Sequence, residues 1–399
     1  MSFGIALSGI NAINTELDTI SNNIANSGTY GFKSSRANFA AMYAGATPTG
    51  AEVGSLSQSI DTGGGILTTG RGMDASISGR GFFAARDPSG AMVYSRVGIL
   101  NTDKDGNVTD SSGRMVQGYA ATPGSTALGG LGDLKVPNGQ IPAMPSDKVQ
   151  YVANLSSSWP AMPVSPPGPA FDSTDERTFN SSMVTPVYDS LGSKHTLRQF
   201  FVKTGDNQID VHYTFDGAAV ATTQTLQFNS NGQLTSPTAP VSLALGTPAG
   251  ASAVTVAMDY TGTTQFDDET TATVNAANGY ASGTMIGVSL AEDGSVMAQY
   301  SNGEKMKAGT LALATFPDES ALVPVNNTSW TTSAASGQAL YFAPGSGMAG
   351  TLSVGSIEQS NVDMTGELVS LMSSQRNYQA NTKVISTEDA MMQSLMQAV

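Results

Sequence analysis

The chain has 399 residues, enough for two to four domains, of which 40 % are hydrophobic and only 13 % are charged. A net charge of −14, with no basic cluster longer than two residues, argues against nucleic-acid binding and against attraction to anionic lipid. The absence of cysteine excludes disulfides, thiolate catalysis and cysteine-based metal sites.

The first residues carry no basic segment ahead of an apolar one, so we expect no cleaved secretory signal. No stretch of 18 apolar residues occurs, so we also expect no membrane insertion. Two locations remain open at this point: the cytosol, or export by a route that needs no cleaved signal.

An apolar stripe near the N-terminus predicts a helix over residues 3–26, ended by Asn26-Ser27-Gly28. Its members follow one another in steps of three and four residues, which places them on one side of a helix. They are Phe3, Ala6, Ile10, Ile13, Leu17, Ile20 and Ile24.

A second stripe near the C-terminus recurs every seven residues and predicts a helix that begins near 361. Its members are Leu371, Tyr378, Ile385, Met392 and Val399, with Leu368 and Met396 in the same seam. Gln375, Thr382 and Asp389 interrupt the seam and either set its register or simply face solvent. Each stripe needs a covering helix, so either the chain returns its end to its beginning or the helices pack on other copies.

Between the two helices the chain is expected to be mainly β, with short strands and many turns. Residues 31–72 look extended and are interpreted as a connecting arm. Residues 73–148 and 281–360 predict an inner β-domain, and 149–280 an outer β-domain that carries half of the net charge. The predicted fold is therefore a nested, mainly β, multidomain chain whose terminal helices, 1–30 and 361–399, form a coiled-coil-like inner domain.

Few residues suggest a chemical site. Asp103-Lys104-Asp105-Gly106-Asn107 resembles a calcium loop, but its glycine falls fourth, where an EF-hand needs it sixth, so a hairpin turn is the better interpretation. His195 and His212 are expected to be exposed strand residues. We therefore predict no catalytic residue, no metal and no cofactor. Asn22, Asn23 and Asn26 cluster at the end of the first helix, where they cap it, bond to neighbouring subunits, or do both.

Three segments resemble the flagellar hook and rod family of bacterial axial proteins. The first runs from Asn22 to Lys33, the second from Gly70 to Gly98, and the third joins Ser360-Asn361-Val362-Asp363 to Gln375–Asn381. Residues 184–192 are similar to a hook-protein segment in particular. One departure is Ile99-Leu100, where the family more often has an aromatic residue.

The resemblance implies a structural subunit of the flagellar hook, with terminal helices lining a channel and β-domains outside. Implied partners are further copies of the chain, the distal rod, the hook cap, the hook–filament junction protein and the flagellar type III export apparatus. The alternatives are a distal rod subunit, which the long outer insert disfavours, and a secreted β-rich adhesin, which leaves both helical stripes unexplained. The residues expected to carry self-assembly are Ile10, Ile13, Leu17, Ile20, Ile24, Asn22, Asn23, Asn26, Leu368, Leu371, Gln375, Tyr378, Ile385, Met392 and Met396.

Overall fold

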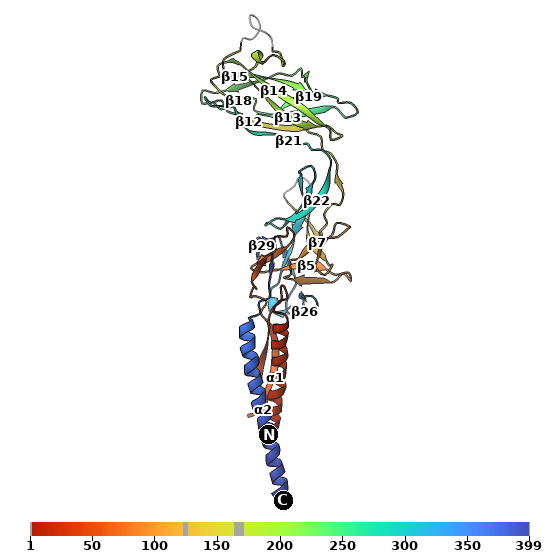
Figure 1. The fold of residues 1–399 in the computed structure, drawn as a ribbon, viewed down its shortest axis with the longest axis vertical. Coiled ribbons are helices and arrows are strands. Elements are labelled where there is room, and N and C mark those ends of the chain that lie inside the picture. Colours follow the sequence, from red (N-terminus) through yellow and green to blue (C-terminus); the bar gives the residue numbers. More distant parts are fainter. Residues whose placement is uncertain (1, 123–126, 163–170, 399) are drawn as a thin grey trace. The chain divides into compact units, whose positions relative to one another are not determined.

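A computed structural model describes residues 2–122, 127–162 and 171–398. The chain is mainly β, with one long helix near each end, which confirms the predicted fold class (Figure 1). It forms two compact units. Unit 1 comprises Met1–Asn138, Gly287–Gln299 and Lys305–Val399, and unit 2 comprises Gly139–Ile286 and Tyr300–Glu304. Unit 2 is thus inserted within unit 1, which is the nested order that the sequence predicts.

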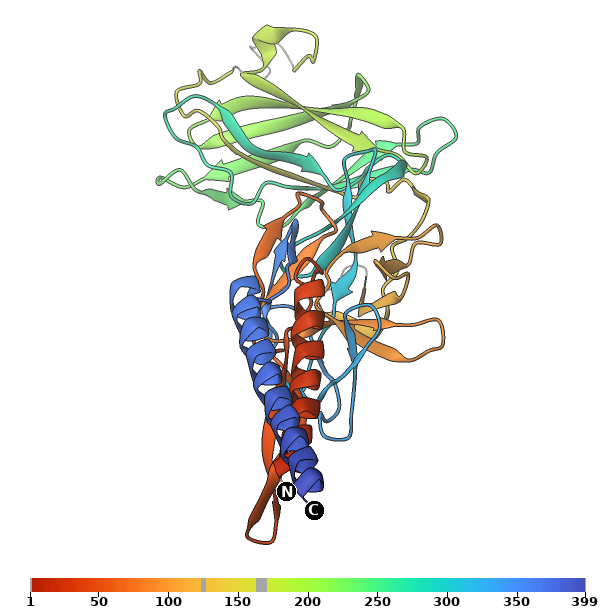
Figure 2. The ribbon, with the colours of Figure 1, turned by 60° about the horizontal axis from the view of Figure 1, so that its bottom comes forward.

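The two helices are α1 (Ser2–Ala25) and α2 (Met364–Ala398). Helix α2 begins at Met364 because Asp363 caps it, accepting the backbone N–H of Thr365 at 3.1 Å. The predicted start near 361 is therefore a few residues too early. The helices lie side by side and run in opposite directions, so the chain does return its end to its beginning (Figure 2).

The expected arm is a β-hairpin followed by a short strand: β1 (Ser35–Ala44), β2 (Thr47–Gln58) and β3 (Ile66–Thr68). The hairpin folds back against α1, where Ser8 Oγ accepts the backbone N–H of Ala51 at 3.2 Å. Gly50 makes this approach possible, since a Cβ at that position would lie 1.9 Å from Ser8 Oγ. The arm therefore supports α1 along its length.

The β-part of unit 1 is built around an aromatic core of Phe82, Tyr94, Phe316 and Trp330, all nearly inaccessible to solvent. Phe316 meets Tyr94 edge-on at 4.8 Å between ring centroids. Its strands are β4 (Ala75–Ser78), β5 (Phe82–Arg86), β6 (Met92–Ser95), β7 (Leu100–Thr102), β8 (Val108–Asp110), β9 (Met115–Ala121), β10 (Leu128–Asp133), β24 (Lys305–Leu311), β25 (Leu313–Thr315), β26 (Val323–Val325), β27 (Ser329–Thr331), β28 (Leu340–Phe342), β29 (Thr351–Val354) and β30 (Ser356–Glu358).

Several hairpin turns of this unit share one construction. The Asp103 carboxylate accepts the backbone N–H groups of Asp105 and Asn107, and Gly106 takes a positive φ of 83°. This segment is the calcium-like loop of the sequence, and its first carboxylate is occupied by its own backbone. The same pattern recurs at Asp87 and Asp110.

Unit 2 packs two sheets against each other. One has the order β19-β20-β12-β21 and the other the order β13-β14-β15-β17-β18. Their facing side chains form a core that includes Val149, Tyr151, Phe201 and Val256. The strands of the unit are β11 (Gln140–Ile141), β12 (Lys148–Asn154), β13 (Ser181–Tyr188), β14 (Lys194–Gly205), β15 (Gln208–Phe215), β16 (Ala218–Ala219), β17 (Gln224–Phe228), β18 (Leu234–Ser236), β19 (Val241–Gly246), β20 (Val254–Asp259) and β21 (Thr271–Ala277).

Two further strands, β22 (Gly283–Leu290) and β23 (Ser295–Tyr300), belong in part to each unit. The short strands that the sequence predicts for this part of the chain are present, for example β13, β15 and β20. Short 3₁₀ turns lie at Glu176–Thr178 and Glu319–Ala321.

Candidate assembly surface and its anchoring network

A ladder of polar contacts joins the two terminal helices. Asn23 Nδ2 donates to Glu367 Oε1 at 2.8 Å, and Ser374 Oγ donates to Glu16 Oε2 at 2.8 Å. At the third rung the helices approach closely, since a Cβ on Gly9 would lie 3.2 Å from Asn381 Nδ2. The residues of the ladder are spaced by seven positions on each helix. They are Gly9, Glu16 and Asn23 on α1 and Glu367, Ser374 and Asn381 on α2. The ladder fixes the register of the antiparallel pair.

Asn23 is the most constrained member of the ladder and is only 1 % exposed. Its amide nitrogen also donates to the carbonyl of Ser35, and its amide oxygen accepts the backbone N–H of Ser35. One side chain thereby holds α1, the first residue of β1 and α2 together. Every hydrogen-bonding group of this buried amide is used, as a stable buried polar group requires.

The apolar stripe of α1 lies beside the ladder. Ala6, Ile13 and Ile20 are buried, and Ile10, Leu17 and Ile24 are half-buried. Phe3, at the start of the stripe, is 49 % exposed. The chain itself therefore covers most of this stripe, which an isolated helix would leave in water.

The apolar stripe of α2 is covered only in part. Leu371 and Ile385 are half-buried, whereas Leu368, Tyr378, Met392 and Met396 are exposed. The polar residues that face α1 stand one position before the Gln375, Thr382 and Asp389 of the sequence analysis, and those three are exposed.

Helix α2 is longer than its partner. Seven residues before Gly9, α1 begins at Ser2, and the position opposite it on α2, seven residues after Asn381, is Glu388. Residues 389–398 of α2 therefore have no α1 residue opposite, over a length of about 15 Å. In this segment the positions that continue the α1-facing side of the helix are apolar. Met392 stands one heptad after Ile385, and Leu395 stands one heptad after Glu388. Met391, Met392, Leu395 and Met396 are between 57 % and 73 % exposed.

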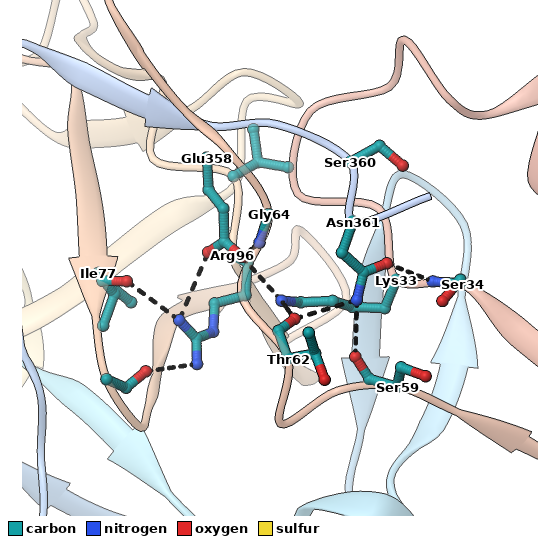
Figure 3. A network of polar contacts seen from close by, with 12 residues as sticks. Lys33, Ser34, Ser59, Thr62, Gly64, Ile77, Arg96, Glu358, Ser360 and Asn361 are labelled. Carbon is teal, nitrogen blue, oxygen red and sulfur yellow. Dashed lines mark hydrogen bonds and ion pairs between the residues drawn. The ribbon is translucent and has the colours of Figure 1, made fainter. Parts of the chain in front are cut away.

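A buried ion network lies in the same unit (Figure 3). The Glu358 carboxylate accepts Lys33 Nζ at 2.7 Å, the backbone N–H of Gly64 at 3.0 Å and Arg96 at 3.4 Å. The three charged side chains are at most 4 % exposed. Arg96 also donates to the carbonyls of Ile77 and Gly79.

Burial is the main influence on the two cations. It lowers the pKa of Lys33 and the pKa of Arg96 below their ordinary values, although the Glu358 carboxylate acts in the opposite direction on both. A network of this kind adds little net stability when complete, but the loss of one partner leaves a buried charge uncompensated. The network joins three distant parts of the chain, those that carry Lys33, Arg96 and Glu358.

Asn361 extends the network toward α2. Its side-chain oxygen accepts the backbone N–H of Ser34 at 2.7 Å, and its nitrogen donates to the carbonyls of Ser59 and Thr62. Lys33, Arg96 and Asn361 come from the three segments that resemble the axial proteins. Those segments, far apart in the sequence, therefore meet at one point (Figure 3).

The remaining site residues from the sequence lie apart from the ladder. Asn26 Nδ2 donates to Asn22 Oδ1 at 2.8 Å, and Asn26 Oδ1 also accepts the hydroxyl of Thr29, as is typical of local bonding at a helix end.

The expectation that both histidines are exposed is wrong. His195 bonds to two carboxylates, and His212 stacks on Phe171 with 4.1 Å between ring centroids.

Sequence reasoning missed the ladder residues Glu16, Glu367, Ser374 and Asn381, and it missed Glu358. A polar seven-residue repeat on α2 was noticed, but at Gln375, Thr382 and Asp389, one position after the ladder residues, and the matching Glu16 and Asn23 on α1 were not paired with it. Over the described ranges there is no cluster of three or more His, Cys, Asp or Glu side chains suited to a metal ion. Neither of the two described helices is long and apolar enough to cross a membrane.

Four family models match consecutive parts of the chain. They are described as flagella basal body rod protein (residues 3–33), flagellar hook protein FlgE/F/G D1 domain (76–150), flagellar basal body protein FlaE D2 domain (154–280) and flagellar basal body rod FlgEFG protein C-terminal (353–398). Together with the paired terminal helices, these matches define a structural protein of the bacterial flagellar axis.

Curated relatives narrow this class. The flagellar hook protein FlgE of Salmonella typhimurium is 37 % identical over 99 % of both chains, and that of Escherichia coli is 36 % identical over the same share. FlgE of Brucella suis is 31 % identical over 98 % of this chain and 96 % of that one. The chain belongs to the flagellar hook protein family. The crystal structure of Helicobacter pylori flagellar hook protein FlgE2 has the same fold, with a TM-score of 0.53 and 12 % identity over 72 % of this chain and 98 % of that one.

Proposed function

We propose that the chain self-assembles into the flagellar hook, a curved and flexible tube that transmits motor torque from the rod to the filament. The observation that carries this proposal is the uncovered seam on α2. Helix α1 of the same chain partly covers the seam, at Leu371 and Ile385, and the continuation at Met392, Leu395 and Met396 faces solvent. A seam of this kind is completed by another helix.

The occupant that we propose for this seam is a helix of a second copy. Four large apolar side chains exposed on the last turns of α2 are unfavourable in a monomer. Contact with another copy in a tube would remove them from water, which stabilises the assembly. Methionine suits such a contact because its flexible thioether adapts to changes of neighbour geometry. In a bent tube, that geometry differs from one subunit to the next.

Leu368, Val369 and Met372 give α2 a second exposed apolar patch. Counted by helical periodicity, they lie roughly 120–160° around α2 from Ser374, which contacts α1. This patch is too far around the helix to be covered by α1. We propose that it contacts a further copy, so that each α2 in the tube has neighbours on two sides.

The finer layout is also a proposal. We assign residues 1–30 and 361–399 to an inner helical layer that lines the channel, 31–72 to the arm, 73–148 and 281–360 to an inner β-domain, and 149–280 to an outer β-domain. The further partners are the distal rod, the hook cap, the hook–filament junction protein and the flagellar type III export apparatus. The assembled chain would lie outside the cell, exported without a cleaved signal.

Electron microscopy of the concentrated, purified protein tests the proposal. Curved tubes are the expected result. Straight rods would favour the distal rod subunit, which is the second candidate because rod-protein models match both ends of the chain. Dispersed monomers at all concentrations would contradict self-assembly.

A further inference from the structure

His195 in unit 2 has a carboxylate against each of its two ring nitrogens. Nδ1 lies 2.6 Å from Asp216 Oδ2, and Nε2 lies 3.2 Å from Asp189 Oδ2. Asp189 follows β13 and Asp216 follows β15, so the ring, near the start of β14, joins two turns of the sheet. Its side chain is 15 % exposed and lies beside the ring of Phe215, at 5.1 Å between centroids.

Both carboxylates are held in the ionised form. Burial acts to raise the pKa of Asp189, but the backbone N–H of Ser193 and the His195 ring outweigh it and hold this pKa below its ordinary value. The pKa of Asp216 is lowered in the same way: burial opposes the shift, while the backbone N–H of Thr196 and the His195 ring produce it. The ring therefore faces two anions.

A neutral imidazole has one N–H, so it can donate to only one of these carboxylates and must turn a lone pair toward the other. Only the imidazolium ion donates to both. We propose that His195 is a proton-operated clamp: protonated, it ties the turn at 189–193 to the turn at 216–217, and on deprotonation it releases the Asp216 turn.

Asp216 lies nearer to the ring, at 2.6 Å against 3.2 Å for Asp189, but it is the partner that is released because it is the one that water can reach. Its side chain is 47 % exposed, so water can replace the ring, whereas that of Asp189 is 3 % exposed. Asp216 itself has a φ of 49°, an uncommon conformation for a residue with a side chain, and Gly217 follows at 84°. Without the ring, this strained turn loses a side-chain contact that holds it.

The direction of the pH dependence follows from the same contacts. Burial lowers the pKa of His195, but the hydrogen bonds to Asp216 and Asp189 outweigh it and raise this pKa above 6.5. The stabilisation is therefore complete below pH 6.5 and is lost as the pH rises through the raised value. Among the described residues, the charged groups that face the ring are these two carboxylates. Arg198 lines a hollow together with Asp216, and Lys194, adjacent in the chain, is exposed.

The chain contains only two histidines, which makes the test direct. We would follow both rings by NMR in the full-length monomer labelled at histidine, across pH 5–9. His212 is the internal reference, because burial lowers its pKa. We expect His195 to titrate above 6.5 and His212 below it. A His195 midpoint at or below 6.5 would overturn the proposal without the use of any variant.

Amide hydrogen exchange then tests the release. After correction for the intrinsic pH dependence of exchange, protection at residues 216–219 should fall as the pH passes the His195 midpoint. His195→Gln, a neutral side chain, should show the low protection at every pH, and His212→Gln should behave as the wild type. Protection at 216–219 that does not change across the midpoint in the wild type would rule out the clamp.

Discussion

Asn23 and Glu367 stand 344 positions apart in the chain and are joined by a hydrogen bond of 2.8 Å between the two terminal helices. The bond is one rung of a ladder that repeats every seven residues. Because the ladder fixes the register of α1 against α2, it also determines which part of α2 extends beyond its partner. The uncovered seam thus follows from the register and from the lengths of the two helices.

Replacing Asn23 by alanine should loosen the helical pair. The change leaves Glu367 and both backbone groups of Ser35 without this partner, and a buried unsatisfied polar group costs about 1–3 kcal/mol. We expect amide exchange in α1 of the monomer to accelerate roughly tenfold to a hundredfold. Asn14→Ala, at an exposed position on the same helix, is the control and should change exchange little. Equal effects of the two substitutions would mean that the ladder does not hold the helices.

Glu358→Gln should destabilise unit 1 while leaving unit 2 unchanged. The substitution removes the charge that compensates buried Lys33 and Arg96, and breaking a buried ion pair on one side costs about 3–5 kcal/mol. Calorimetry of the full chain should show a lowered transition for unit 1 only. The matched control is Glu52→Gln on the exposed side of β2, which should shift neither transition. An unchanged unit 1 transition in Glu358→Gln would contradict the anchoring role of the network.

Ile13→Asp or Ile385→Asp should prevent tube formation while both β-parts stay folded. Ile13 is 8 % exposed, and Ile385 is half-buried opposite the start of α1. A carboxylate buried without a partner costs several kcal/mol, and every subunit repeats that cost. Circular dichroism should show lost helix with retained β-signal, and electron microscopy should show no tubes. Normal hooks in cells that carry either variant would mean that these positions do not contribute to assembly.

Removal of most of unit 2 should change the shape of the tube and leave its formation intact. Met144 and Tyr280 exchange backbone hydrogen bonds of 3.0 Å and 2.9 Å, so a short Gly-Ser turn can join them in place of residues 145–279. The helices and the aromatic core of unit 1 are outside the deletion. We expect straighter or mechanically weaker polymers in negative-stain images. If the deleted chain were folded and exported but formed no polymer, the assembly determinants would lie in unit 2.

The fold was predictable where the signal is local. The stripe from Ala6 to Ile24 predicts α1 because burial of one helix face requires that period, and the Asp-x-x-Gly turns predict hairpins because their hydrogen bonds lie within five residues. Residues 103–107 were correctly interpreted as a turn for this reason.

The candidate site was predictable only in part, because its contacts join distant segments. Nothing near Lys33 in the sequence indicates that its partner is Glu358, since the pairing exists only once the arm and β30 meet. His195 was misjudged for a related reason: Asp216 is 21 residues away and reaches the ring only through the pairing of β14 with β15. On α2, the apolar seven-residue repeat was identified, but the polar positions that face α1 were placed one residue too late.

The account rests on the uncovered seam of α2, and complementation of a flagellated strain that lacks its own hook protein tests it most directly. Leu395→Glu and Met396→Glu place charge on the seam without touching the ladder, while Lys383→Glu, at an exposed position of the same helix, is the charge control. In electron micrographs we predict curved hooks for the wild-type chain and for the control. The two seam variants should be exported as folded monomers with no hook. Normal hooks in both seam variants would contradict assembly through this surface.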